Sequence, residues 1–572
     1  MPRVDPPAEV PPELSRVDVG PESVLTGPVP GAGQEDGPVR GHQDRALPGG
    51  RRHRGDQRSD LAKFARDTVI KFVGSAANGI FGFLGVVVIT RGLHAGKAGA
   101  FFEAFALFTI LSSIAEMGAD TGFMRAIPQY RALGRTSDVR KTLLLGLAPV
   151  VPIAAIFAAL MFAFAPELAR VLAGHGRNVQ TVIPFLRVLA PFIPLAAVTT
   201  VALAATRGFR TMVPSVVINN VFGPALRPVL VVVVLAMGLG PVAIGAAWAA
   251  PLAIGTPLTI AWLLFLLRRA ERRDNAVGLS PTKPPRRLAA EFWRFSSPRA
   301  IAAVFSTLTT WLDTILVGAL RSTGEAGIYT ASTRYVIVGT VFIQAIVIVI
   351  SPQIAGLLAR REGFDRARSL LQSTTAWLVM ATWPIYFTLA VFAPLFLRVF
   401  GKEFVAGQTP LMILALGVLF STGVGPAGAV LLMGGKSSWN LINTIAALVV
   451  NVGLNLLLIP HLGMTGAAIA WVASIVVSNL LPLIQVRAFL GLSPFSAPYV
   501  AVGIMSAFLF GGLGLAVRLT LGPSLPAFLL YACVSTGLYA VVLWKNRARL
   551  HLSMLLTSLR PRQARGMGAA RP

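Results

Sequence analysis

The chain carries ionisable side chains inside long apolar stretches, where a charge is costly to bury. In the stretch 311–335, WLDTILVGALRSTGEAGIYTASTRY, Asp313 and Arg334 lie about equally far from a short polar turn at 321–325. With a rise of about 1.5 Å per residue, helices on either side of this turn place both side chains at nearly the same depth. The spacing therefore predicts an ion pair. Such a pair either holds the two helices together or lines a cleft, where Arg334 attracts phosphate and Asp313 gates it or carries a proton.

Arg227 lies between Pro224 and Pro228, near the middle of another apolar stretch, 213–238. Proline removes a backbone donor, so this spacing predicts a local break in a helix. A broken helix at mid-membrane depth is typical of a transport site, and a guanidinium group there suits an anionic head group. We therefore interpret Arg227 as an anion-binding residue.

Five more charged residues lie within or just beyond the apolar stretches. Glu103 and Arg187 lie a few residues inside two of them, where they either pair or extend to the membrane surface. Glu116, Asp120 and Arg125 follow at the inner end of a stretch. They form either the cytoplasmic mouth of a cleft or a solvated helix end.

Three further residues complete the candidate set. Lys71 lies near the inner end of the first stretch, where a lysine usually extends to the interface. Asn451 and Asn455 share one helical face with Asn440 and Thr444. Amide side chains suit sugar hydroxyls, but they also join helices within a membrane, and both interpretations stay open. One cysteine and six scattered histidines provide no metal spacing, so we expect no metal and no cofactor.

Membrane-spanning helices must position these residues. The 572 residues are 54% hydrophobic and 13% charged, with a mean hydropathy of +0.69, whereas soluble domains carry about 25% charged residues. Because about 20 apolar residues cross a bilayer as a helix, the sequence predicts an all-α, polytopic membrane protein with about fourteen transmembrane helices. The predicted spans are 68–90, 98–119, 141–166, 181–205, 213–238, 241–267, 296–320, 326–354, 370–396, 407–433, 438–459, 463–488, 496–518 and 524–544.

Lysine and arginine are concentrated in alternate inter-span segments, beginning with RRHRGDQR at 51–58. The positive-inside rule then predicts that both termini are cytoplasmic. This distribution accounts for the formal net charge of +27 without any nucleic-acid partner. The predicted outer loops are short, which weighs against membrane glycosyltransferases, polymerases and ligases.

An internal repeat divides the membrane part into two halves. GKAGAFFEAFAL from Gly96 matches GEAGIYTASTRY from Gly324, and two further matches follow at nearly the same offset. At that offset the first copy has Gly85 and Ala106 where the second has Asp313 and Arg334, so the repeated fold does not require the charged pair. Six spans per half give both halves one orientation in the membrane. The predicted parts are a disordered tail (1–67), a first six-helix lobe (68–268), a cytoplasmic loop (269–295), a second six-helix lobe (296–490), two extra helices (491–546) and a basic tail (547–572).

Three segments resemble the oligosaccharide flippases of polysaccharide biosynthesis: LDTILVGALRSTGEAGIYTASTRY, NVGLNLLLIPHLGMTGAAIAWVAS and LSSIAEMGADTGFMRAIPQY. These flippases belong to the superfamily that also holds lipid II flippases and multidrug-and-toxin extrusion transporters. The resemblance covers roughly 65–545. It implies a transporter, not an enzyme, that moves a polyprenyl-pyrophosphate-linked oligosaccharide across the bacterial plasma membrane by alternating access. Its implied partners are the lipid-linked substrate, the bilayer, polysaccharide polymerases and glycosyltransferases.

The sequence leaves several alternatives open. A cation-coupled multidrug antiporter needs acidic residues in its cleft, so Arg227 and Arg334 count against it. A lipid II flippase suits fourteen spans, but the first span has only Lys71 where that group has a basic pattern. A membrane polymerase or ligase would need larger outer loops and a catalytic constellation, and a scaffold would recruit partners through the basic tails. No ATP-binding motif is visible, so the energy would come from an ion gradient, the membrane potential or product removal.

Overall fold

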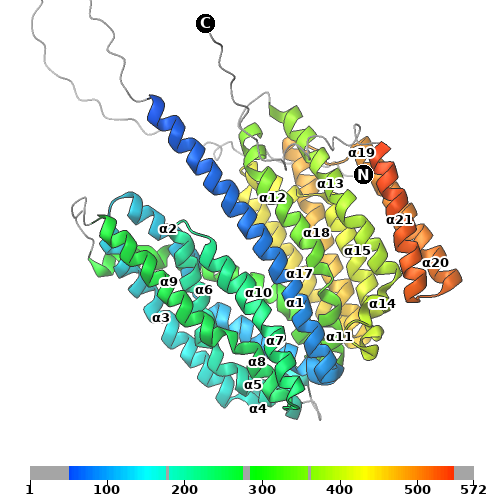
Figure 1. The fold of residues 1–572 in the computed structure, drawn as a ribbon, viewed down its shortest axis with the longest axis horizontal. Helices are drawn as coiled ribbons and strands as arrows, with labels where there is room; N and C mark the ends of the chain where they lie inside the picture. The colour runs from blue at the N-terminus through cyan, green and yellow to red at the C-terminus, as the bar shows by residue number, and fades with distance from the viewer. Residues whose placement is uncertain (1–49, 175–178, 275–283, 359–362, 546–572) are drawn as a thin grey trace, which may run out of the picture. The chain divides into compact units, whose positions relative to one another are not determined.

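The computed structural model describes residues 50–174, 179–274, 284–358 and 363–545, and every element within these ranges is helical (Figure 1). The described residues from 62 to 545 belong to one unit. The first half contains α1 (Gly50–Ala115), α2 (Ala119–Ala132), α3 (Thr136–Ala163), α4 (Ala165–Ala173), α5 (Val179–Leu189), η1 (Ala190–Phe192), α6 (Ile193–Gly208), η2 (Ser215–Phe222), α7 (Gly223–Ala236), α8 (Pro241–Ala249) and α9 (Pro251–Asp274).

The second half follows the same pattern of long helices and short turns. It contains α10 (Pro285–Leu320), α11 (Thr323–Thr333), α12 (Val336–Leu358), α13 (Phe364–Val391), α14 (Ala393–Leu397), η4 (Lys402–Gly407), α15 (Gln408–Val424), α16 (Ala427–Met433), α17 (Ser437–Leu462), α18 (Met464–Leu490), α19 (Ala497–Ser506), η5 (Ala507–Gly512), α20 (Leu513–Leu521) and α21 (Leu525–Lys545).

Twelve described helices are long and apolar enough to cross a membrane, and the chain is a multi-pass membrane protein. The first of the twelve, Lys71–Ala132, covers the predicted spans 68–90 and 98–119. It does so because the helix continues through a kink at His94, whose φ is 59°. The predicted span 326–354 corresponds to α11 and α12, which are not among the twelve. The count of fourteen spans therefore stays a prediction.

Two predicted boundaries differ from the structure. Helix α1 begins at Gly50, so the described end of the tail 1–67 is helical rather than disordered; residues 1–49 lie outside the described residues. Helix α10 begins at Pro285, within the predicted loop 269–295. Proline suits this position because the first N–H groups of a helix have no intrahelical acceptor. The predicted basic tail 547–572 also lies outside the described residues.

Helix α10 packs against both halves of the chain. It contacts α2, α3 and α4 of the first half, and α11, α17 and α18 of the second. Within the second half, α13, α15, α18 and α17 pack in sequence (Figure 1). Helices α20 and α21 lie side by side next to η5, where the Tyr539 hydroxyl donates to the Met380 carbonyl of α13 at 3.0 Å. A residue of α10 can therefore meet side chains from either half.

The two copies of the repeated glycine motif touch each other. GKAG at 96–99 ends in Gly99, and GEAG at 324–327 ends in Gly327. A Cβ atom on Gly327 would lie 2.9 Å from the Gly99 nitrogen, and one on Gly99 would collide with the Thr323 carbonyl oxygen. Only glycine permits this approach of α1 to α11. A contact between equivalent residues is what a two-fold relation between the repeats would produce.

Candidate functional site

Arg334 follows the last residue of α11, and its guanidinium lies over the Trp311 ring of α10. Its Cζ is 5.4 Å from the ring centroid, and its Nε donates to the Thr330 carbonyl at 3.3 Å. The side chain is half-buried. A guanidinium has five N–H donors, so this stacking leaves donors for an anion while the ring stabilises the charge.

Arg227 has a similar environment in the first half. Its guanidinium lies over the Trp248 ring of α8, 5.3 Å from the centroid. Its Nε is buried and has no hydrogen-bond partner among the described residues. A buried guanidinium nitrogen without an acceptor is costly, and a bound anion would supply that acceptor.

The helix that carries Arg227 is distorted rather than broken. The chain stays helical from 213 to 236, but η2 is a π-helix that ends directly before Gly223 and Pro224. Because proline has no N–H, the regular hydrogen-bond ladder cannot run through this point, and the wider turn absorbs the mismatch. The predicted break at Pro224 is therefore corrected to a π-helical segment.

Phe105 of α1 connects the two tryptophans. Its ring meets Trp248 edge-to-face at a centroid distance of 6.0 Å, and meets Trp311 in the same manner at 5.4 Å. Arg227 and Arg334 thus lie at opposite ends of one series of contacting rings, hereafter the Arg–Trp series. The two arginines come from the two halves of the chain, so the series links both predicted lobes.

Asp313 does not pair with Arg334, and that prediction is wrong. Within the described residues no ion pair joins them; instead the Tyr329 hydroxyl donates to Asp313 Oδ2 at 3.0 Å, and Asn455 Nδ2 donates to Oδ1 at 2.7 Å. Tyr329 and Arg334 are five residues apart, which separates them by about 140° around a helix. Asp313 and Arg334 therefore do not face each other, although the spacing predicts equal depth.

The Asp313 cluster joins three helices: α10, α11 and α17. Asn455 connects α17 to Asp313, and Asn451, one helical turn earlier on α17, is fully buried and interacts with the same carboxylate. The carboxylate and the amide oxygens are acceptors of the type that hard cations prefer. In the described part of the chain, no three His, Cys, Asp or Glu side chains gather as a metal site.

Glu103 and Arg187 do not pair either. Glu103 is fully buried, its carboxylate packs against Gly318 of α10, and neither oxygen has a hydrogen-bond partner among the described residues. Arg187 is exposed on α5 and lies over the Phe162 ring at 5.7 Å. Of the two alternatives for these residues, the pair is therefore not formed, because one side chain is buried and the other is exposed.

The residues of the predicted cytoplasmic mouth have two different sets of neighbours. Glu116 and Asp120, at the turn between α1 and α2, interact electrostatically with Arg207 of α6. Arg207 was missed because it follows the end of the predicted span 181–205. Arg125 instead stacks on Phe295 of α10 at 4.2 Å.

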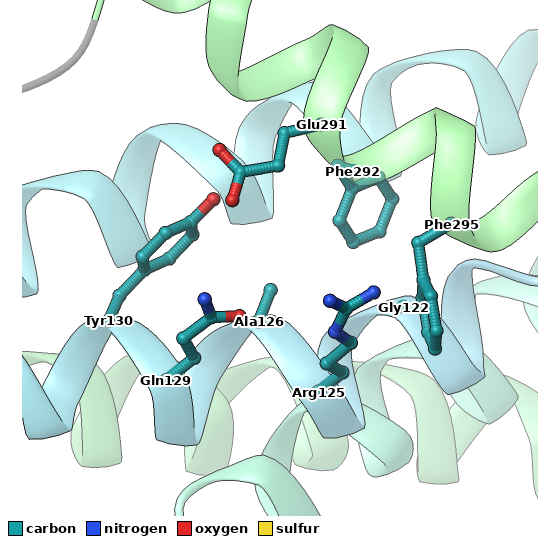
Figure 2. A pocket seen from close by; sticks show the side chains of 8 residues that line it. All are labelled: Gly122, Arg125, Ala126, Gln129, Tyr130, Glu291, Phe292 and Phe295. Atoms are coloured by element: carbon teal, nitrogen blue, oxygen red, sulfur yellow. The ribbon is translucent and has the colours of Figure 1, made fainter. Parts of the chain in front are cut away.

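Figure 2 shows the small pocket beside this stack. Arg125, Gln129 and Tyr130 of α2 face Glu291 and Phe295 of α10 across it. Lys71, on α1, has an exposed side chain. Neither Glu291 nor Phe295 is identifiable as a site residue from the sequence, because both lie in the predicted loop 269–295.

A model of the family described as polysaccharide biosynthesis protein matches residues 64–358, which is more than half of the chain. The chain belongs to this family. It is also 23% identical, over 457 residues, to a probable low-salt glycan biosynthesis flippase of Haloferax volcanii, covering 78% of this chain and 89% of that protein.

Solved structures identify the fold. A lipid II flippase in an inward closed conformation matches with a TM-score of 0.66 at 14% identity, covering 84% of this chain and 100% of the flippase. A multidrug resistance MATE family transporter of the MOP superfamily, in an inward-facing conformation, matches with a TM-score of 0.59 at 17% identity, covering 72% and 94%. The family member described here therefore has the fold of MOP superfamily transporters.

Proposed function

We propose that this protein is a flippase that moves a polyprenyl-pyrophosphate-linked oligosaccharide from the inner to the outer leaflet for cell-surface polysaccharide biosynthesis. One observation carries the proposal: Arg227 and Arg334, one from each half of the chain, lie at the two ends of the Arg–Trp series. Family membership and the similarity to a glycan biosynthesis flippase support a transport role over an enzymatic one.

The chemistry of the two arginines suits a pyrophosphate group. Guanidinium groups bind phosphate oxygens through paired, charge-assisted hydrogen bonds, and they stay charged in apolar surroundings better than most cations. Each of the two groups offers N–H donors that suit phosphate oxygens. A transporter of cationic drugs would instead place its arginines away from the ligand, because like charges repel.

Alternating access needs two lobes that separate in turn. We assign them to the predicted halves 68–268 and 296–490, with 491–546 as an addition, and the Gly99–Gly327 contact as the seal between them on the outer side. The orientation follows the distribution of lysine and arginine, with both termini cytoplasmic in a bacterial plasma membrane. Polysaccharide polymerase and glycosyltransferases are the proposed partners on the two sides.

A reconstituted translocation assay tests the proposal. Proteoliposomes with a fluorescent polyprenyl-pyrophosphate oligosaccharide are sampled for lipid accessible at the far leaflet. A charge-assisted hydrogen bond contributes about 1.5–3 kcal/mol, so Arg227→Ala and Arg334→Ala should each slow translocation by about tenfold or more. Arg334→Lys should retain part of the rate, because it keeps the charge without the paired donors.

The matched control is Arg170→Ala. Arg170 is an arginine of α4 that is exposed and paired with Glu167 at 3.7 Å, away from the Arg–Trp series. Wild-type rates in both Arg227→Ala and Arg334→Ala would refute phosphate binding by this series. The same liposomes loaded with lipid II or with a cationic dye test the alternative substrates. If either one is transported faster than the lipid-linked oligosaccharide, that compound becomes the preferred candidate substrate.

A further inference from the structure

A second basic site lies where α2 meets the start of α10. There an open cavity of about 480 Å³ is lined by Arg125, Arg287, Ala290, Glu291, Arg294 and Phe295. The lining comes from two helices that are far apart in the sequence. We call this cavity the α2–α10 pocket; the smaller pocket in Figure 2 adjoins it and shares Arg125, Glu291 and Phe295.

A tight helix crossing builds the pocket. At Gly122 of α2, a Cβ atom would lie 2.7 Å from the Phe292 ring and would collide with the Ser296 hydroxyl. One turn further along α2, the Arg125 guanidinium lies over Phe295 at 4.2 Å, and Arg299 of α10 lies over the same ring at 5.7 Å. Cation–π stacking on one ring therefore orients two guanidinium groups.

The charges around the pocket are unbalanced. Arg125, Arg287 and Arg294 line it, and Arg299 lies over the Phe295 ring of its lining. None of the four has an ion-pair partner within 4.0 Å among the residues that the structure describes. Glu291 is the one acidic residue in the lining. Arg287 also lies in the first turn of α10, which has no acidic residue, so the positive end of the helix dipole adds to the repulsion. An anion in the pocket would reduce the repulsion among the arginines and the repulsion between Arg287 and the positive end of the helix dipole.

We propose that the α2–α10 pocket binds the pyrophosphate head group of a polyprenyl lipid at the membrane surface, before that group reaches Arg227 and Arg334. A volume of about 480 Å³ exceeds the need of a simple ion and falls within the range of small-ligand pockets. The identity of the lipid rests on the proposed function, whereas the binding of a lipid-borne phosphate rests on the arginines alone.

Binding is measured on the purified full-length protein with farnesyl pyrophosphate as the probe, and with farnesol as the uncharged probe. Arg125→Gln and Arg294→Gln should each weaken farnesyl pyrophosphate binding about tenfold or more, because each removes a charge-assisted hydrogen bond worth about 1.5–3 kcal/mol. Farnesol binding should not change. Arg140→Gln is the matched control, since Arg140 pairs with Glu271 at 4.0 Å.

Three further measurements separate this site from the central one. Arg227→Ala combined with Arg334→Ala should leave the pocket's share of farnesyl pyrophosphate binding intact, and adding Arg294→Gln to that background should weaken the remaining binding about tenfold or more. In the translocation assay, Arg294→Gln should raise the half-saturating substrate concentration with little change in maximal rate. If the wild-type protein binds farnesyl pyrophosphate but does not translocate the lipid-linked oligosaccharide, that result contradicts the proposed function and leaves the proposed binding by the pocket standing.

Two results would overturn the inference. Unchanged farnesyl pyrophosphate binding in the Arg125→Gln/Arg294→Gln variant would remove the site. Equal competition by phosphatidylglycerol vesicles would assign the pocket to bilayer phospholipid instead of a pyrophosphate lipid.

Discussion

The Gly99–Gly327 contact leads to a prediction about the equilibrium between the joined and separated lobes. In Gly99→Ala, the added methyl group meets the Thr323 carbonyl oxygen and lies 2.9 Å from the Gly327 nitrogen. Both are backbone atoms, so no side-chain rotation relieves the clash, and α1 must move away from α11. Overpacking of this kind costs about 1–3 kcal/mol. Because the cost falls only on the joined state, the ratio of joined to separated lobes should drop by about 5- to 150-fold.

The repeat itself supplies the control. Gly96 begins the motif that Gly99 ends, and a Cβ atom there would meet nothing within 4 Å. Gly96→Ala adds the same methyl group to the same helix and should leave the equilibrium unchanged. Gly324→Ala is the equivalent control in the second copy, where the nearest atom, the Ser322 hydroxyl, is 3.8 Å away.

Distances between spin labels report the result. The single cysteine, Cys533, is replaced by serine, and labels are attached through Val171→Cys on α4 and Leu519→Cys on α20, which are 69% and 76% exposed. Gly99→Ala should shift the distance distribution to longer values, whereas Gly96→Ala should match the parent protein. Identical distributions in the two variants would show that this contact does not seal the lobes.

Two further predictions concern buried polar groups. In a double-mutant cycle on thermal stability, Asp313→Asn should couple to Asn455→Leu by about 0.5–3 kcal/mol, since the two side chains share a hydrogen bond of 2.7 Å. Asp313→Asn should couple to Arg334→Gln by less than about 0.5 kcal/mol. A larger coupling to Arg334→Gln would indicate that Asp313 and Arg334 form an ion pair after all. Glu103→Gln should leave the thermal stability equal or higher, because no described residue forms a hydrogen bond with the carboxylate. Gly318→Ala should lower the thermal stability, because the added methyl group collides with the Glu103 side chain. A large loss of thermal stability in Glu103→Gln would show that the carboxylate has a partner.

The sequence by itself determined the class of this protein. A chain that is 54% hydrophobic, with uninterrupted apolar stretches of about 20 residues, is predicted to form membrane helices, because a helix pairs its backbone groups within itself and needs about that length to cross a bilayer. It also predicted that the charged residues Asp313, Arg334 and Arg227 lie within membrane-spanning helices, since depth along a helix follows from residue number. The repeated GxxG motif was equally visible.

The partners of these residues were decided only by the tertiary structure. Residue number sets how deep a side chain lies, but the face that it meets depends on how helices from distant parts of the chain pack. Asp313 therefore meets Asn455, and the two arginines meet Trp248 and Trp311, none of which spacing could indicate. Likewise the repeat predicted two similar halves, while only packing brought Gly99 of one against Gly327 of the other.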